Sequence, residues 1–161
     1  MTFSTAGLCD SYSEQEHFQI AEPIFNCYGA NTTFSGRIST LKTFEDDILI
    51  RAMLSEKVKD RVLVIDGGGS RRCALIDGEI VRLAIDNGWQ GIIVYGCLRD
   101  TVAISQLPIG IRALHAHPLK THKKDHGDRD LVISFAGINF KKDHFLYADI
   151  DGIIVSETML S

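Results

Sequence analysis

This chain lacks the features that would place it in a membrane, secreted or multidomain class. Its 161 residues include only three prolines and no low-complexity stretch, so we expect one domain over residues 1–161. No apolar run approaches the roughly 20 residues that a membrane-spanning helix needs. The first dozen residues carry neither a basic segment nor an apolar one, so a signal peptide is not expected. These absences predict a cytoplasmic globular protein without membrane contact.

Cysteine pairs and excess positive charge are also missing. The four cysteines, Cys9, Cys27, Cys73 and Cys97, are far apart and show no CxxC spacing, which predicts free thiols rather than a zinc site. The net charge is −4 and the pI about 5.8, so direct nucleic-acid binding is not expected. Four histidines at positions 115, 117, 122 and 126 lie close in sequence, but without cysteines they predict a metal cluster only weakly.

The most informative part of the chain is the segment Arg61 to Asp100. An apolar, β-branched run is followed by three glycines, then by a segment with apolar residues at helical spacing, and then by a second buried run that ends before Arg99–Asp100. This order predicts a parallel strand–helix–strand unit. Ligands of such sheets gather beyond the carboxyl ends of the strands. We therefore expect Ser70, Gly78 and Arg99 to face a common cleft.

Flanking segments predict further strands and two helices. Helices are expected near Ser4–Glu16 and over Thr43–Glu56, and residues Lys120–Asp130 should form an exposed polar loop. Strands are expected at Thr33–Lys42, Ile109–His117, Leu131–Phe140 (with a glycine break), Phe145–Asp149 and Ile153–Ser156. Strand-rich ends around a crossover helix predict an α/β fold of the layered α/β/β sandwich type.

The residues at the expected cleft have chemistry that suits an anion and a cation. The glycine turn 67–70 could donate backbone N–H groups, although such turns are more often purely structural. The segment Asp77-Gly78-Glu79-Ile80 opens a helix, and its N–H groups favour a carboxylate. Arg99 could hold a carboxylate or enolate oxygen, and Asp100 is an oxygen ligand for magnesium or manganese. A surface ion pair is the alternative interpretation of Arg99–Asp100.

The same residues carry a family resemblance that extends over nearly the whole chain. The chain resembles the RraA-like proteins, which include the regulator of ribonuclease E activity and the class II, metal-dependent 4-hydroxy-4-methyl-2-oxoglutarate aldolases. The matching pieces are Leu8-Cys9-Asp10, Phe34-Ser35-Gly36, Arg61 to Ser70, Asn87-Gly88-Trp89, Tyr95 to Asp100, His117-Pro118, Phe135-Ala136-Gly137, Tyr147-Ala148-Asp149 and Gly152 to Val155.

The resemblance implies a fold related to swivelling phosphohistidine domains, assembled as a homotrimer. It implies an aldolase that cleaves 4-hydroxy-4-methyl-2-oxoglutarate to pyruvate and also decarboxylates oxaloacetate through a shared enolate. In this pattern Arg99 and Asp100 are catalytic, Asp100 binds the divalent metal, and residues Asp77, Gly78, Glu79 and Ile80 bind the small 2-keto acid with Arg99. No lysine needs to form a Schiff base.

Two departures from the aldolase pattern keep a second function open. The aldolases carry an aspartate where this chain has Gly78, and longer members have a C-terminal extension with an acidic residue, whereas this sequence ends at Ser161. The alternative is a regulator that binds ribonuclease E and inhibits it, although the regulator branch typically lacks the aspartate that here is Asp100. A methyltransferase, which a glycine turn could also indicate, is not favoured because no acidic ribose-binding residue follows on a second strand.

Overall fold

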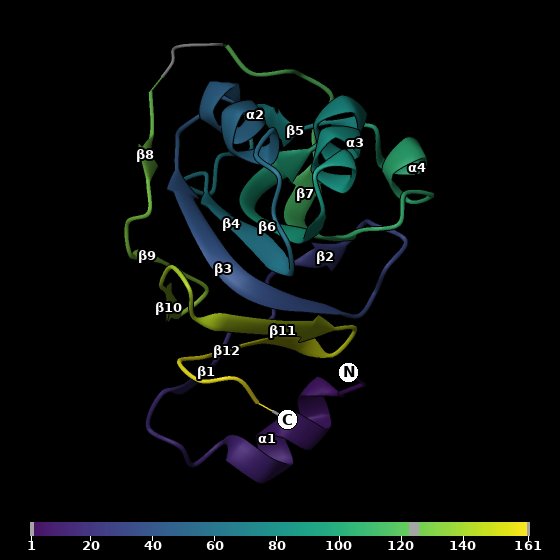
Figure 1. Ribbon diagram of the computed structural model, residues 1–161. Helices are drawn as coiled ribbons and strands as arrows, with labels where there is room; N and C mark the ends of the chain where they lie inside the picture. The colour runs from purple at the N-terminus through teal and green to yellow at the C-terminus, as the bar shows by residue number, and fades with distance from the viewer. Residues whose placement is uncertain (1, 123–125, 161) are drawn as a thin grey trace.

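One large mixed β-sheet forms the frame of the molecule in the computed structural model, which describes residues 2–122 and 126–160 (Figure 1). Within these residues, eight strands follow one another across the sheet, and the short strands β5 (Ala74–Ile76) and β8 (Asp128–Arg129) pair beside β6 and β3. In spatial order the eight are β1 (Phe18–Ile20), β12 (Gly152–Ser156), β11 (Phe145–Asp149), β3 (Phe34–Lys42), β4 (Arg61–Asp66), β6 (Trp89–Leu98), β7 (Gly110–Ala116) and β2 (Asn26–Cys27).

The centre of this sheet is the predicted parallel unit. Strand β4 pairs in parallel with β3 on one side and with β6 on the other, and β6 pairs in parallel with β7. Helix α3 (Gly78–Asp86) connects β5 to β6 and buries Ile80, Val81 and Ala84 against the sheet. Gly88 lies between the end of α3 and the start of β6, and its φ of +88° is one that glycine adopts without strain. The strand–helix–strand prediction is confirmed, with β5 as an addition that the sequence pattern did not indicate.

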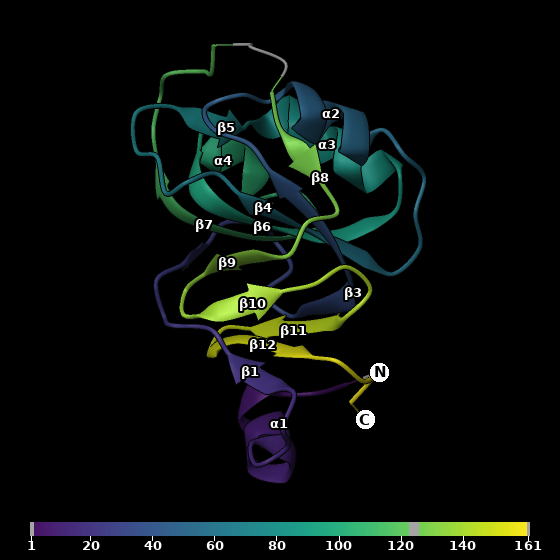
Figure 2. The same cartoon turned by 90° about the vertical axis from the view of Figure 1, so that its left-hand side faces the viewer.

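The two faces of the sheet are covered by different kinds of structure. Helix α2 (Ile48–Leu54) and α3 lie on one face, over a core that includes Leu41, Leu63 and Ile92. A hairpin of β9 (Ile133–Phe135) and β10 (Ile138–Phe140) lies on the other face (Figure 2). Its apolar side chains belong to a second core with Ile38, Val62 and Ile93. Helices, sheet and hairpin therefore form the layered α/β fold that was predicted.

The N-terminal helix closes one end of the molecule. Helix α1 (Thr5–Tyr12) begins at a capping Ser4, whose hydroxyl accepts a hydrogen bond from the Gly7 amide at 3.0 Å. Asp149 accepts from the Thr5 amide at 2.7 Å and from the Thr5 hydroxyl at 2.6 Å. Burial would raise the pKa of Asp149, but these hydrogen bonds, with those from the amides of Asp151 and Gly152, lower its pKa.

Several predicted boundaries were wrong. The helix expected over Thr43–Glu56 begins only at Ile48, because its preceding acidic residues form a bend in which Asp46 accepts from the Ile48 amide at 3.1 Å. The single strand expected over Leu131–Phe140 is a hairpin that reverses at Ala136 and Gly137, both with positive φ. The helix near Ser4–Glu16 is present but ends at Tyr12.

The short elements escaped prediction altogether. Strands β1 and β2 and helix α4 (Thr101–Ile104) were not expected, since two to four residues carry too little periodicity to detect. Part of the polar loop expected at Lys120–Asp130 forms β8, and residues 123–125 of it lie outside the described residues. In the part of the chain that the structure describes, no helix has the length and apolar character to cross a membrane.

Candidate active site

The predicted site residues meet where the parallel strands end. Arg99 and Asp100 follow β6 directly, and the Arg99 amide donates to the Ile76 carbonyl at 3.1 Å, which joins the end of β6 to the end of β5. Residue 77 then leads into α3, so Arg99 and the first turn of that helix lie side by side. The expectation that Arg99 lies near Gly78 is confirmed.

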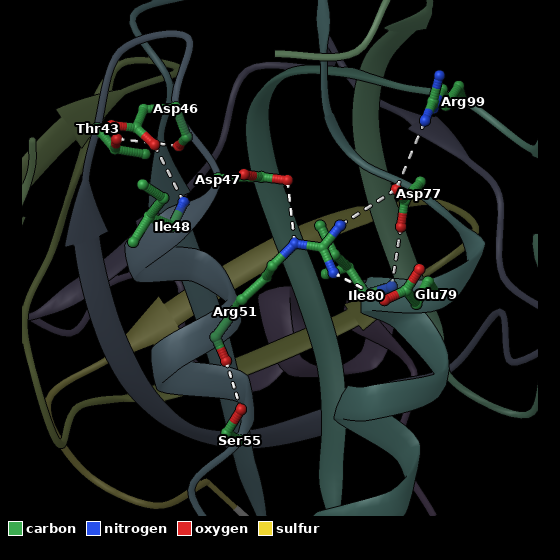
Figure 3. A network of polar contacts seen from close by, with 10 residues as sticks. All are labelled: Thr43, Asp46, Asp47, Ile48, Arg51, Ser55, Asp77, Glu79, Ile80 and Arg99. Atoms are coloured by element: carbon green, nitrogen blue, oxygen red, sulfur yellow. Dashed lines mark hydrogen bonds and ion pairs between the residues drawn. The ribbon is translucent and has the colours of Figure 1, made fainter. Parts of the chain in front are cut away.

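Asp77 organises the start of α3. Its Oδ1 accepts a hydrogen bond from the Ile80 amide at 2.9 Å, which satisfies one of the N–H groups that a helix leaves unpaired at its first turn. Its Oδ2 lies 3.9 Å from Nη2 of Arg99 (Figure 3). One carboxylate therefore caps the helix and also faces the arginine that was predicted to bind the substrate.

Asp100 is fixed by an unusual backbone and by a hydrogen bond to α3. Its φ of 63° and ψ of 39° place it in the left-handed region, where aspartate is among the residues tolerated. Its Oδ2 accepts from the Gly78 amide at 2.9 Å. The left-handed backbone and this hydrogen bond together fix the direction of the Asp100 carboxylate.

These two carboxylates use two of the four amides, those of residues 77–80, that the resemblance assigns to a substrate. The Gly78 amide donates to Asp100 and the Ile80 amide donates to Asp77, while the Ile80 side chain lies in the core. Among the hydrogen bonds of the described residues, the Glu79 amide is the one N–H of residues 78–80 without an acceptor. That amide is the first-turn donor open to a bound carboxylate.

Arg99 borders two adjoining pockets. One, of about 370 Å³, is lined by Arg99, Asp100 and Thr101 together with residues 116–118. The other, of about 500 Å³, is lined by Asp47, Arg51, Asp77, Glu79, Arg99, Lys120, Thr121 and His122. The predicted metal ligand thus lies on one side of the arginine, and the predicted substrate residues Asp77 and Glu79 lie on the other.

A larger cavity, of about 640 Å³, lies at the opposite edge of the sheet, where the parallel strands begin. Its lining includes Phe34, Arg37, Asp60 and Tyr147, with an apolar rim from the two terminal segments. Arg37 there stacks over the Phe145 ring at 5.3 Å. The size of a cavity does not by itself identify a reactive site. The lining of this cavity has fewer charged side chains than the pocket that contains Arg51, Asp77 and Arg99.

The glycine turn is not part of the Arg99 pockets. The amides of Gly67 and Gly69 both donate to the Tyr95 carbonyl at 3.1 Å, and the Gly68 amide donates to Asp66 Oδ1 at 2.9 Å. The Ser70 hydroxyl donates to Glu45 Oε2 at 2.6 Å. The prediction that Ser70 shares a cleft with Gly78 and Arg99 was wrong, because Ser70 lines neither Arg99 pocket and its hydroxyl is engaged by Glu45.

Arg51, which sequence reasoning missed, is the hub of the polar network (Figure 3). Its Nε donates to Asp47 Oδ2 at 3.2 Å, its Nη1 donates to Glu79 Oε1 at 3.1 Å, and its Nη2 lies 3.5 Å from Asp77 Oδ2. Burial alone would lower the pKa of Arg51, but the hydrogen bond and charge of Asp47 with the charges of Asp77 and Glu79 raise its pKa. The four-residue spacing of Asp47 and Arg51 on a helix was the available signal.

Asp47 itself is buried and incompletely paired. The residue is only 6% exposed, and its Oδ1 has no hydrogen-bond partner among the described residues. Its other oxygen holds Arg51. Burying a carboxylate costs free energy unless a well-placed partner compensates its charge. The Asp47–Arg51 pair therefore holds the Arg51 guanidinium at this wall of the pocket.

The donors available for a divalent cation are few but chemically suitable. Asp100 offers Oδ1, a hard oxygen of the kind that magnesium and manganese prefer. No group of three or more His, Cys, Asp or Glu side chains within residues 2–122 and 126–160 could enclose a metal ion. Magnesium commonly binds through one or two carboxylates and keeps water and substrate oxygens as its other ligands. The Asp100 carboxylate therefore fits a cation of this type only as one ligand among several.

Gly78 leaves room for the aspartate found in the aldolase pattern. A Cβ built on Gly78 would lie 3.2 Å from Arg82 Nη1 and 3.5 Å from Asp100 Oδ2. A side chain here would point to the same place as the Asp100 carboxylate and the Arg82 guanidinium. The missing carboxylate thus belongs to the Asp100 side of the site, and the flexible end of Arg82 occupies its neighbourhood.

The predicted histidines do different things. His115 is exposed at the end of β7, and His117 Nδ1 accepts from the Leu119 amide at 3.1 Å. His117 lines the pocket that contains Asp100, whereas His122 lines the pocket that contains Asp77. Two of the histidines, His117 and His122, therefore border the Arg99 pockets from the segment after β7.

With this geometry in place, comparison with known proteins identifies the family. The family model described as RraA-like, Aldolase/RraA, matches residues 5–155, so the chain belongs to the RraA-like family. A protein of Methylococcus capsulatus is 61% identical over 160 residues, covering 99% of each chain. A protein of Arabidopsis thaliana is 47% identical over 162 residues, covering 99% of this chain and 98% of its own. Both are named "Putative 4-hydroxy-4-methyl-2-oxoglutarate aldolase", the plant protein with the number 3.

Solved structures agree on the fold and carry two other names. The RNA-processing inhibitor RraA from Thermus thermophilis matches with a TM-score of 0.94 and 37% identity, over 100% of this chain and 96% of its own. A structure from Geobacillus kaustophilus, titled an S-adenosylmethionine: 2-dimethylmenaquinone methyltransferase, matches with a TM-score of 0.94 and 39% identity, over 98% and 97%. The family resemblance read from the sequence is confirmed.

Proposed function

We propose that this protein is a divalent-cation-dependent aldolase that cleaves 4-hydroxy-4-methyl-2-oxoglutarate into two molecules of pyruvate. The observation that carries the proposal is the convergence of Arg99, Asp100 and the first turn of α3 at one edge of the sheet. The names of the bacterial and plant relatives support it. Decarboxylation of oxaloacetate is proposed as a second activity, because it passes through the same pyruvate enolate.

The cleavage breaks the bond between C3 and C4 of the substrate. The C4 hydroxyl loses its proton and becomes the carbonyl of one pyruvate, while the bonding electron pair moves onto the other fragment as an enolate. A proton delivered to C3 then completes the second pyruvate. Negative charge develops on the enolate oxygen, and Arg99 borders the space in which that oxygen would lie. Its guanidinium stabilises such a charge by paired hydrogen bonds.

The other residues of the site bind and orient the substrate. The Glu79 amide, at the positive end of α3, is placed to donate to the substrate carboxylate. Asp100 would hold the cation through Oδ1, since its Oδ2 is engaged by the Gly78 amide. A bound divalent cation supplies Lewis-acid stabilisation of the enolate, so the chemistry requires no Schiff-base lysine.

Pyruvate release tests the proposal directly. We expect pyruvate from 4-hydroxy-4-methyl-2-oxoglutarate and from oxaloacetate in the presence of magnesium or manganese, and loss of both activities when a chelator removes the cation. A lactate-dehydrogenase-coupled assay measures the rate, and restoring excess magnesium is the control for nonspecific effects of the chelator. Turnover that is unchanged by the chelator would contradict the cation dependence, and absence of turnover on both substrates would contradict the aldolase.

A regulator of ribonuclease E is the second candidate, and the close match to an RNA-processing inhibitor RraA favours it. In that case the working surface is a protein-binding face, and the Arg99 pockets contribute nothing to inhibition. Ribonuclease E activity measured with stoichiometric amounts of this protein separates the two functions. Inhibition that persists in an Arg99→Ala variant, with no pyruvate release by the unmodified protein, would establish the regulator. The methyltransferase title of the other neighbour gains no support from the glycine turn, whose amides of Gly67, Gly68 and Gly69 are all engaged.

The proposed assembly is a homotrimer, as the family resemblance implies, and the proposed location is the cytoplasm, as expected from the sequence. Sedimentation velocity at micromolar concentration tests the assembly, with a species of three times the 17.8 kDa chain mass as the expected result. A monomer at that concentration would contradict it.

A further inference from the structure

Two arginines from different elements point at a single carboxylate oxygen in the candidate site. Asp77 Oδ2 lies 3.5 Å from Nη2 of Arg51 on α2 and 3.9 Å from Nη2 of Arg99 after β6 (Figure 3). Both distances exceed those of a charge-assisted hydrogen bond, so neither guanidinium is tightly bound at this position. The two Nη2 groups therefore flank a common space with unused donor capacity.

The orientation of Arg51 is built into the fold. Its Nε donates to Asp47, whose carboxylate is buried and otherwise unpaired at Oδ1 among the described residues. Its remaining partner, Glu79, has a side chain that is 81% exposed, so water screens that ion pair strongly. Asp47 thus fixes the Nε side of the Arg51 guanidinium, whereas the contacts of its Nη groups are weak. The Nη groups are therefore available to a ligand at the wall of the 500 Å³ pocket.

The surroundings of Arg51 favour an anion. Lys120, Thr121 and His122 line the same pocket across from Arg51 and Arg99, and each carries a hydrogen-bond donor. Each of the three carboxylates in this lining already contacts an arginine or the helix: Asp77 caps α3 and faces Arg51 and Arg99, and Asp47 and Glu79 pair with Arg51. An added anion would therefore meet guanidinium and ammonium groups rather than uncompensated negative charge.

We propose that Arg51 is a specificity-determining residue that binds the distal carboxylate of a dicarboxylic 2-keto acid, while Arg99 binds the keto-acid end. This inference rests on the proposed function, and it assigns a residue of this chain to the second carboxylate that both proposed substrates carry. The two carboxyl carbons of an extended five-carbon keto diacid are roughly 5 Å apart, from C–C bonds of about 1.5 Å. Because both Nη2 groups lie within 4 Å of the same Asp77 oxygen, they are close enough for the two carboxylates of one such molecule to contact one guanidinium each from the pocket side.

The alternative is that Arg51 only supports Asp77 and has no contact with substrate. Loss of a support would disturb the α3 cap and Arg99 together, and it would weaken binding of every keto acid alike. Loss of a carboxylate-binding residue would weaken binding only of ligands that carry the distal carboxylate. The two roles therefore predict different ratios between the loss of diacid binding and the loss of monoacid binding, and not only losses of different size.

The test compares a diacid with a monoacid in the Arg51→Gln variant of the full-length protein with magnesium present. Calorimetry measures binding of 2-oxoglutarate and of pyruvate, and kinetics compare 4-hydroxy-4-methyl-2-oxoglutarate with 4-hydroxy-4-methyl-2-oxopentanoate, in which a methyl group replaces the distal carboxylate. We expect the dissociation constant for 2-oxoglutarate and the KM for the diacid to rise about 10- to 100-fold, as for loss of a charged hydrogen bond. Values for pyruvate and for the monoacid should stay within about twofold.

Two further variants make the result specific. Arg51→Lys keeps the charge but loses the planar fork, so its effect on diacids should fall between those of the unmodified protein and Arg51→Gln. Arg129→Gln is the matched control, because Arg129 is also a surface arginine that pairs with one carboxylate, Glu56, at 2.6 Å and 3.0 Å, but it does not line the Arg99 pockets. It should leave both ligands unaffected.

Each outcome decides the inference. Equal losses for diacid and monoacid would overturn it and make Arg51 a support for Asp77, as would an unmodified protein that binds 2-oxoglutarate no more tightly than pyruvate. If the unmodified protein releases no pyruvate from any substrate but its binding of 2-oxoglutarate depends on Arg51, the aldolase fails and the diacid-binding site stands. Selective loss in both binding and KM supports the aldolase and the diacid site together.

Discussion

Two loops leave neighbouring parts of the central sheet at the same edge and use their backbones in opposite ways. The glycine turn after β4 donates the amides of Gly67, Gly68 and Gly69 to Tyr95 and Asp66, so it is closed within the protein. The segment that opens α3 borders a pocket, with the Glu79 amide unpaired among the described residues and Arg99 beside it. Glycine content marks a sharp turn, whereas a ligand site requires donors that the protein itself leaves unused.

The contrast between the two loops would be contradicted most clearly if loss of a polar side chain reduced activity equally in the glycine turn and at the start of α3. Arg99→Ala should reduce pyruvate release by about 10²-fold or more, since it removes a group that stabilises the developing enolate charge. Asp100→Ala should abolish the response to magnesium. Steady-state kinetics measure both.

Ser70→Ala is the matched control for these variants, because Ser70 lies in the glycine turn and donates to Glu45. It should stay within about twofold of the unmodified activity. A loss at Ser70 equal to that at Arg99 would show that the glycine turn is part of the reactive site. Circular dichroism confirms that each variant is folded.

The second test asks whether the glycine turn serves stability instead. A Cβ on Gly67 would lie 2.4 Å from Leu75 Cδ1 and 2.7 Å from the Tyr95 carbonyl oxygen, so Gly67→Ala forces the turn apart. We expect it to lower the free energy of unfolding by about 1–3 kcal/mol, as for overpacking of a core. Denaturant titration measures the change. Gly152→Ala, where an added Cβ meets nothing within 4 Å, is the control and should be close to neutral.

The third test extends the comparison to the β11–β12 turn, far from the candidate site. Because the pKa of Asp149 in the folded protein lies below its ordinary value of 3.8, its ionised form stabilises the fold above that pH, and this stabilisation is lost as the pH falls through the lowered pKa. Asp149→Asn should cost about 1–3 kcal/mol at pH 7 and much less in strong acid. Unfolding curves from pH 7 down to pH 2 measure this, and a cost that does not shrink below pH 3.8 would contradict the role of the charge.

The smallest effect is expected at Gly78, where the open loop differs from the aldolase pattern. Gly78→Asp places a carboxylate beside Asp100, and the added Cβ lies 3.2 Å from Nη1 at the flexible end of Arg82, which must move aside. If the aldolase proposal holds, pyruvate release should rise by a factor of about 2–10, since a few tenths to about 1.4 kcal/mol is a typical gain from one added polar contact. Gly78→Asn, of the same size without charge, should give no gain. Equal rates for the two variants would show that the carboxylate has no role here.

The fold was largely predictable because its centre obeys strong local rules. The apolar runs that became β4 and β6 and the helical spacing of Ile80, Val81 and Ala84 specified the parallel unit and the position of Arg99–Asp100. The layer on the opposite face was harder to foresee. Its hairpin requires a positive φ at Ala136, and alanine is not one of the residue types from which a turn is predicted.

The candidate site was predictable only where its residues follow strands in the chain. Arg99, Asp100 and the start of α3 were found because strand ends and helix starts meet at one edge. Arg51 reaches the site from α2, and only the tertiary packing of α2 beside α3 brings it there. The use of the Gly78 and Ile80 amides by Asp100 and Asp77 was equally hidden, because it depends on the directions of individual side chains.

The left-handed backbone at Asp100 limits which substitutions this position tolerates during evolution. Only glycine, asparagine and aspartate adopt such a conformation at little cost, whereas other residues lose roughly 1–2 kcal/mol. Aspartate codons reach asparagine and glycine codons by a single base change. A gene could therefore lose the Asp100 carboxylate in one step while the encoded protein stays folded and soluble enough to be retained for another use.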